Sequence, residues 1–188
     1  MITMKDFIPE QDPLLRKEVE PVTFPLSEEL RERALEMRQF LIDSQTPELA
    51  EKYQLRPGVG VAGPQIGLDQ QIFAIYLVEY DEDGQVVDTI IDQIFINPKI
   101  KSHSVQEAAL KEGEGCLSVP REVPGLVPRA KRVTLTYQDL DGNSHEIKLR
   151  NYEAIVVQHE YDHLKGILFY DHINPDQPWK ADPDLELL

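Results

Sequence analysis

The fold is decided by AIVVQHEYDH, residues 154–163, in which two histidines stand four positions apart with a glutamate beside the first. Positions four apart lie on one face of a helix, about one turn from each other. His159 and His163 can therefore grip one ion, while Glu160 can reach a water molecule held there. The apolar run from Ala154 to Val157 predicts that this helix is buried. Buried imidazoles and a buried carboxylate are costly without a partner, so this context favours metal binding over a chance match on a surface helix.

Two histidines do not complete a catalytic site, and the chain offers few candidates for a third ligand. Metzincin-type proteases place another histidine shortly after the second, at a position that Phe169 occupies here. Thermolysin-type enzymes use a downstream glutamate, and acids that far along, such as Glu186, lie in a proline-rich tail. The remaining candidate is Cys116, the only cysteine, with Gly115 before it to let the backbone approach an ion. A lone cysteine is more often core filler, but the missing ligand favours coordination. Three protein ligands leave a fourth position open for water, as catalytic sites do.

The segment PGVGVAGPQIG, residues 57–67, contains the G-x-G-x-x-G pattern of dinucleotide-binding proteins. That fingerprint must follow a strand and open a helix. Here Pro57 precedes the pattern, and Pro64 and Gly67 prevent a helix after it, so we reject a dinucleotide site. The segment is better interpreted as a loop along which a substrate backbone can lie. Gln65 carries an amide that could donate to an oxyanion, although on spacing alone it is an ordinary loop residue.

Strand-like stretches dominate between two helical segments, which predicts an α+β fold. We expect antiparallel strands packed around the central histidine-bearing helix, together with an N-terminal helix. A single catalytic domain should cover residues 1–188, with an irregular N-terminal arm at 1–25 and a loose, proline-rich tail at 174–188. The expected elements are helices at 27–44, 47–53 and 152–164 and strands at 71–78, 90–96, 133–137 and 146–149.

Turn and capping residues set the expected boundaries of two of these elements. The Asn97-Pro98 pair should close the strand that precedes it. Asn151 can cap the central helix, and Gly166 can end it in the left-handed conformation that glycine tolerates.

Composition excludes several classes of function. The net charge of −15, from 34 acidic against 19 basic residues, disfavours general binding to phosphate backbones, so we expect no direct nucleic-acid contact. The longest apolar run, Ile72 to Val78, is far too short to span a membrane, and the N-terminus lacks the apolar core of a signal peptide. One cysteine cannot form an internal disulfide, which fits a reducing compartment. We therefore expect a cytoplasmic protein.

Three motifs together resemble the signatures of the peptide deformylase family. They are GVGVAGPQ at 58–65, EGCLS at 114–118 and QHEYDH at 158–163, in the family's order. The segment DPLLR at 12–16 is also similar to the start of the family. A longer insertion before the glycine loop and the absence of a long C-terminal helix resemble the type 2 class. One departure is Gly63, where the family usually has alanine, and it bears on the stiffness of the loop.

The family removes the formyl group from the N-terminal formyl-methionine of nascent polypeptides and releases formate. The resemblance implies a metal-dependent hydrolase in which Cys116, His159 and His163 hold one Fe2+ per chain, with Glu160 as acid and base. Zn2+, Ni2+ or Co2+ would substitute for the iron. The implied partners are N-formyl-methionyl peptides, with the ribosome as a further candidate, and we expect a monomer.

The resemblance also assigns roles outside the ligand set. Gln65 and the backbone N–H of Leu117 would stabilise the oxyanion. Val59, Gly60 and Gly115 would line the groove that binds the peptide. These roles come from the family's motifs and not from the spacing of the residues.

Two other interpretations stay open at the level of the sequence. A metallopeptidase would cleave an unblocked peptide instead of formyl-Met-Ala. A non-enzymatic metal-binding protein should have a fourth protein ligand, and it has no need for Glu160 or Gln65 beside the metal.

Overall fold

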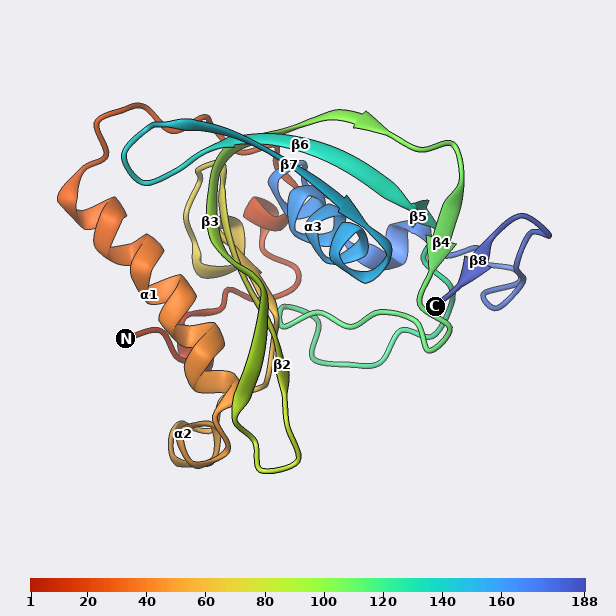
Figure 1. Cartoon of the computed structure of the whole chain (residues 1–188), viewed down its shortest axis with the longest axis horizontal. Helices are drawn as coiled ribbons and strands as arrows, with labels where there is room; N and C mark the ends of the chain where they lie inside the picture. The colour runs from red at the N-terminus through yellow and green to blue at the C-terminus, as the bar shows by residue number, and fades with distance from the viewer.

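A five-stranded antiparallel sheet frames the fold (Figure 1). The computed structural model describes residues 1–188. The neighbouring strands are, in order, β1 (Gly60–Ala62), β2 (Ile72–Tyr80), β3 (Val86–His103), β6 (Arg132–Gln138) and β7 (Ser144–Arg150). A smaller sheet joins β5 (Arg129–Ala130), β4 (Glu107–Ala109) and β8 (Glu186–Leu187). The predicted α+β fold is confirmed.

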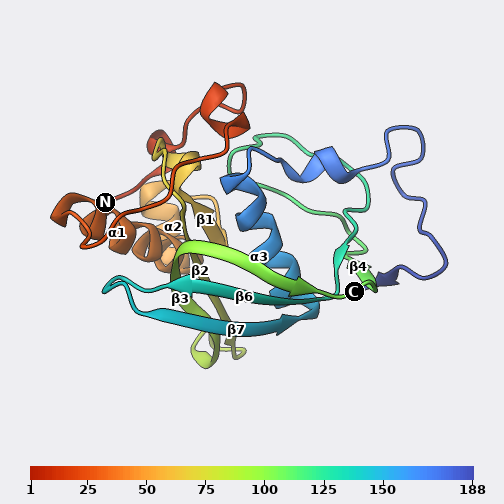
Figure 2. The same ribbon diagram turned by 90° about the horizontal axis from the view of Figure 1, so that it is seen from above.

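The three helices lie where the sequence predicts them. They are α1 (Glu28–Gln45), α2 (Pro47–Tyr53) and α3 (Asn151–Leu164), and short 3-10 helices occupy Met4–Asp6, Pro13–Arg16, Gly63–Ile66 and Phe169–His172. The view turned by 90° shows α3 running behind the strands of the large sheet (Figure 2). No helix combines the length and the apolar character that crossing a membrane requires.

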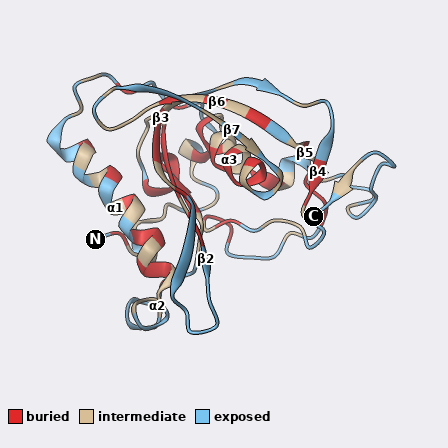
Figure 3. Ribbon diagram, viewed as in Figure 1, coloured by how far each residue is buried: buried red, intermediate tan, exposed pale blue.

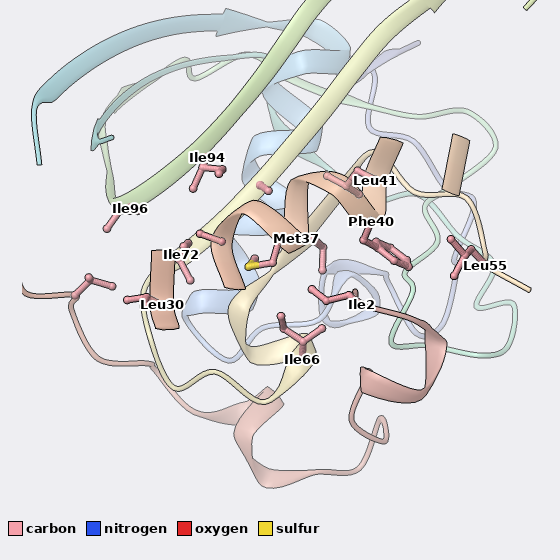
Figure 4. Close-up of a cluster of buried hydrophobic side chains, with 14 residues drawn as sticks. Ile2, Leu30, Met37, Phe40, Leu41, Leu55, Ile66, Ile72, Ile94 and Ile96 are labelled. Carbon is pink, nitrogen blue, oxygen red and sulfur yellow. The ribbon is translucent and has the colours of Figure 1, made fainter. Parts of the chain in front are cut away.

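Strand β2 is covered on both faces, which explains its almost continuous apolar sequence. Successive side chains of a strand point to opposite faces. Ile72 and Ala74 join a core cluster with Met37 and Phe40 of α1 (Figure 4). Phe73 and its neighbours on the other face belong to a second cluster, which contains side chains of α3. β2 and the helices beside it are rich in buried positions, as are the neighbouring β1 and β3 (Figure 3).

The prediction that Asn97-Pro98 closes a strand is wrong, because β3 continues to His103. Asn97 has a φ of 49°, and the register of β3 against β6 shifts between Ile96 and Lys99. This irregularity accommodates the proline, which cannot donate to the ladder. The Asn97 side chain accepts from the N–H of Val22 at 2.7 Å and donates to its carbonyl at 2.8 Å, so it fixes the N-terminal arm to the sheet.

Two further expectations need correction. Asn151 is the first residue of α3 and not its cap: it has a φ of 53°, and no side chain caps the helix. Its backbone N–H donates to the carbonyl of Lys131 at 2.9 Å, so contact with the sheet replaces the cap. The C-terminal tail is not loose at its end, because β8 pairs in parallel with β4. At Asn151 and in the C-terminal tail, contacts with distant parts of the chain thus determine the structure, and local sequence signals do not.

Gly166 follows α3 as predicted, with a φ of +72°, and a Cβ there would lie 2.5 Å from the carbonyl oxygen of Arg16. Gly166→Ala should therefore combine left-handed strain, about 1–2 kcal/mol, with a clash against backbone. Gly84→Ala is the matched control, because Gly84 has a φ of +77° and nothing within 4 Å of a Cβ. Urea unfolding should show a larger loss of unfolding free energy for Gly166→Ala. Equal losses of unfolding free energy in the two variants would mean that the backbone at Arg16 moves away at no measurable cost.

Candidate metal centre and substrate groove

Cys116, His159 and His163 meet in the interior as a group that can hold a metal ion. Their ligand atoms all lie within 4.8 Å of one another. The Sγ of Cys116 is 3.4 Å from Nε2 of His163. Both histidines project from α3, whereas Cys116 lies on the loop between β4 and β5. The three side chains that the sequence singled out are therefore brought together.

The chemistry of this donor set fits a divalent transition metal. Thiolate and imidazole are ligands that zinc, iron and their neighbours accept. Burial opposes ionisation of the Cys116 thiol, but the charge of His163 and the hydrogen bond with His159 outweigh it, so the pKa of the thiol lies well below its ordinary value. A metal ion binds the thiolate and not the thiol, together with neutral imidazoles, and it would itself keep this sulfur deprotonated.

A buried ion-pair network orients His159. Its Nδ1 lies 2.8 Å from Oε1 of Glu114. Arg129 donates to Glu114 from Nε at 2.8 Å and from Nη2 at 3.0 Å, and to Asp162 at 2.8 Å. Burial opposes ionisation of Glu114, but the hydrogen bond with His159 and the Arg129 charge outweigh it and hold its pKa at about 2. With Nδ1 engaged, Nε2 of His159 is free to face an ion.

Sequence reasoning missed this network. Glu114 and Asp162 lie inside the two motifs that were examined, next to residues already assigned, so their positions were a usable signal. Arg129 gave no signal, because only the folded chain brings it between the two carboxylates.

Glu160 is buried beside the ligands with a side-chain oxygen left unpaired. It is 4% exposed, and its Oε2 has no hydrogen-bond partner. Burial raises the pKa of this carboxyl against the opposing charges of His159 and His163. Strand β1 crosses close to it, because a Cβ at Gly60 would lie 2.5 Å from Oε1 of Glu160. Position 60 must therefore be glycine, because any side chain there would collide with the Glu160 carboxylate.

Gln65 is not the ordinary loop residue that spacing alone suggests. It is 1% exposed, and its Oε1 accepts from the N–H of Ala62 at 2.8 Å. Its Nε2 donates to Oγ of Ser118 at 3.0 Å and lies 3.4 Å from Sγ of Cys116. Because the amide oxygen accepts from Ala62, the NH2 group must face the loop between β4 and β5 that carries Cys116, which we call the ligand loop.

Gly63 occupies a tightly packed position, which explains the departure from alanine. A Cβ there would lie 2.9 Å from Cγ2 of Ile72 and 3.2 Å from the carbonyl oxygen of Gln70. All four residues of Gly63–Ile66 are buried. The glycine loop is therefore held by packing, and Ile72 fills the space that a methyl group would need.

A cavity of about 560 Å³ opens beside Glu160 and is lined by the glycine loop, the ligand loop and α3. Val59, Gly60 and Gly115 line it, as does Leu117. A Cβ at Gly115 would meet nothing within 4 Å, so no neighbouring residue of the chain requires glycine there. Because Gly115 has no side chain, this part of the cavity wall stays open.

Comparisons with known proteins agree with this geometry. The sequence model of the family described as polypeptide deformylase matches residues 4–179. A peptide deformylase of Latilactobacillus sakei is 55% identical over 188 residues, covering 100% of both chains. Peptide deformylase 2 of Bacillus anthracis is 50% identical over 184 residues, which is 98% of this chain and 96% of the relative.

Solved structures share the fold. Peptide deformylase from Thermotoga maritima matches with a TM-score of 0.66 at 34% identity, covering 90% of this chain and 97% of that one. Peptide deformylase 1B of Arabidopsis thaliana, in complex with an inhibitor, gives a TM-score of 0.71 at 27% identity, covering 90% and 82%. With the motifs, the fold and the full-length relatives in agreement, this chain belongs to the polypeptide deformylase family, the enzymes that remove the N-formyl group from nascent polypeptides.

Proposed function

We propose that this chain catalyses deformylation at a ferrous ion held by Cys116, His159 and His163, with Glu160 as the acid and base. The observation that carries the proposal is the convergence of three ligand atoms within 4.8 Å of one another beside a buried carboxylate with an unpaired oxygen. A structural metal site closed by four protein ligands would have no use for that carboxylate. Zn2+, Ni2+ or Co2+ could replace the iron, since two imidazoles and a thiolate accept each of them.

Glu160 moves the proton between the two bonds that change. A divalent ion supplies Lewis acidity that activates water and polarises the formyl carbonyl. The Glu160 carboxylate accepts the proton of the attacking water and passes it to the nitrogen as the C–N bond breaks, which releases formate and a free amine. Burial raises the pKa of this carboxyl above its ordinary value, the direction that helps one group to serve as both base and acid.

Two donors are positioned to stabilise the oxyanion. The amide of Gln65 is fixed by Ala62, so its NH2 group is held toward the ligand loop. The N–H of Leu117 donates to no backbone or side-chain acceptor in the chain, and it lies directly after Cys116. Fixed donors of this kind stabilise developing negative charge without reorganising during the reaction.

The glycine loop offers an edge for the substrate backbone. β1 is the terminal strand of the large sheet, so the side of it away from β2 has no strand partner. A peptide can extend along such an edge through its main chain. Val59 and Gly60 would contact the peptide from this side and Gly115 from the other.

The setting of the reaction follows from its substrate. Because nascent chains are the substrate, we propose the cytoplasm as its compartment and the ribosome as a further partner. All the proposed catalytic groups belong to one chain, so we propose that the monomer is active.

Glu160→Gln should retain the metal and lose the chemistry, because this carboxylate moves protons and is not among the proposed ligands. The loss should be about 10²–10⁴-fold, as for other general acid–base groups. The measurement is formate release from formyl-Met-Ala under anaerobic conditions, with metal content determined on the same sample. Loss of metal, or near-normal turnover, would count against the assignment.

Gln65→Leu should lower kcat by a factor on the order of 10²–10³, with little change in KM, because one oxyanion donor is removed. Gln65→Glu is the companion variant, since it keeps the acceptor for the Ala62 N–H and replaces the donors with a negative charge beside Cys116. Steady-state kinetics should show a fall in kcat for both variants, at least as large for Gln65→Glu, because its charge opposes the oxyanion. If KM rises while kcat holds, Gln65 binds substrate and does not stabilise the transition state.

The identity of the ion should control stability toward oxygen. Fe2+ beside a thiolate is vulnerable, since the iron can oxidise and Cys116 can be oxidised as well. Activity of the iron form should decay in air, and Ni2+ or Co2+ should slow the decay while turnover is preserved. Parallel assays with and without oxygen, for each reconstituted metal, test this expectation; equal decay rates would contradict it.

Cys116→Ser should bind metal more weakly, because a hydroxyl is a poorer ligand than a thiolate for these ions. Equilibrium dialysis with Co2+ measures the affinity independently of turnover. Full metal occupancy together with wild-type activity would show that Cys116 is core filler, and the proposed site would collapse.

A further inference from the structure

The last residue of α1 ties the glycine loop to the large sheet. The Nε2 of Gln45 donates to the carbonyl of Gly58 and to that of Tyr76, each at 2.9 Å. Its Oε1 accepts from the hydroxyl of Tyr80, also at 2.9 Å. Both amide hydrogens and the amide oxygen are thereby engaged. One side chain thus joins the end of a helix, a loop and a strand.

The residue before it holds the other backbone group of Gly58. The N–H of Gly58 donates to Oγ of Ser44 at 3.3 Å, and this hydroxyl donates to the carbonyl of Leu41 at 2.9 Å. Both the N–H and the C=O of Gly58 are therefore bound by consecutive residues of α1. This arrangement is specific to the loop, since neither bond belongs to the regular hydrogen bonding of the helix.

The large sheet alone does not fix Gly58. Pairing of β1 with β2 begins at Gly60, which lies opposite Ile75, and the preceding Val59 contributes one bond, from the N–H of Tyr76 to its carbonyl at 2.9 Å. Gly58 lies beyond this paired region. The side chains at the end of α1 supply the bonds that the ladder lacks.

The position of Gly58 matters because this residue packs against Leu117 of the ligand loop, whose N–H is a proposed oxyanion donor. A Cβ at Gly58 would lie 2.8 Å from Cδ1 of Leu117, so the two segments are in close contact. Gln45, Tyr80 and Gly58 also line the same cavity as Val59 and Gly60. A shift of the glycine loop would therefore change the wall of the groove while leaving the ligands on α3 in place.

We propose that Gln45 is a positioning residue, which orders the glycine loop before the peptide arrives. It acts through Gly58 and is not part of the metal-ligand group. A groove that is already ordered binds without the entropic cost of ordering the loop. This inference rests on the proposed role of Val59 and Gly60 as the substrate wall. It assigns to α1, the helix most distant from the chemistry in sequence, control over substrate affinity.

Gln45→Met tests the proposal, because methionine has a similar length and removes all three hydrogen bonds. KM for formyl-Met-Ala should rise roughly tenfold, the effect of losing the one neutral hydrogen bond that reaches the glycine loop, to the carbonyl of Gly58. The kcat and the metal content should hold, since the ligands and Glu160 are untouched. Hydrogen exchange should be faster for the amides of residues 58–60 than in the parent protein.

Two companion variants make the test specific. Gln45→Glu keeps an acceptor for Tyr80 but places a carboxylate against the two carbonyls, so it should raise KM at least as much as Gln45→Met does and serves as the second variant if that one fails to fold. Gln39→Met is the matched control, because the Gln39 amide bonds within α1, to Oδ1 of Asp43 at 2.8 Å. Its KM and its exchange at 58–60 should equal those of the parent.

The outcomes separate this inference from the proposed mechanism. An unchanged KM in the Gln45 variants, or a fall in kcat or metal content without a rise in KM, would overturn the positioning role. A lower melting temperature with normal exchange at 58–60 would do the same, because it would show a purely structural residue. Failure of the mechanism would appear instead as an active Glu160→Gln enzyme, and the exchange measurement does not depend on that result.

Discussion

The structure depends on one constraint: the helix α3 carries polar side chains into the apolar interior of the protein. Ala154–Val157 of α3 are apolar and buried, and the following turns carry His159, Glu160 and His163 into the same interior. Glu160 is 4% exposed and His163 is 1% exposed. Groups of this kind are costly to bury unless a partner compensates them. The ligand loop, the glycine loop and the Arg129 network can each be understood as part of that compensation.

Charge around α3 is compensated in a way that favours a cation. Arg129 is buried between Glu114 and Asp162, with the Glu114 side chain 4% exposed. A buried ion pair often contributes little net stability, because desolvation offsets the attraction. Its clearer consequence is orientation: Glu114 fixes the ring of His159, and Arg129 fixes Glu114. One guanidinium faces two carboxylates, which leaves a negative formal charge on these three residues, and Nε2 of His172 also contacts Asp162, at 2.7 Å.

Local sequence signals predicted the parts of the site that depend on spacing along the chain. The histidines of α3 are set by helical geometry, and Cys116 followed from the lack of any other third ligand. Gln65 was harder, because its role depends on burial and on Ala62, neither of which spacing reveals. The role of Arg129 could not be predicted from the sequence, since Arg129 contacts Glu114 only when β5 pairs with β4 in the second sheet. The same reason explains the errors at Asn97 and Asn151, where contacts with distant backbone replaced the expected strand end and helix cap.

Glycine is what allows the large sheet to meet this polar face. At Gly60 a side chain would collide with the Glu160 carboxylate at 2.5 Å, and at Gly58 it would collide with Leu117 at 2.8 Å. At these two positions the chain backbone therefore lies close to the proposed acid and to the side chain of Leu117. A peptide aligned with that edge would then bring its own main chain to the reacting groups. Backbone without side chains is also the least constrained backbone, since glycine has the most conformational freedom to lose. Hydrogen bonds from outside the loop offset that freedom, and Ser44 and Gln45 at the end of α1 supply two of them to Gly58.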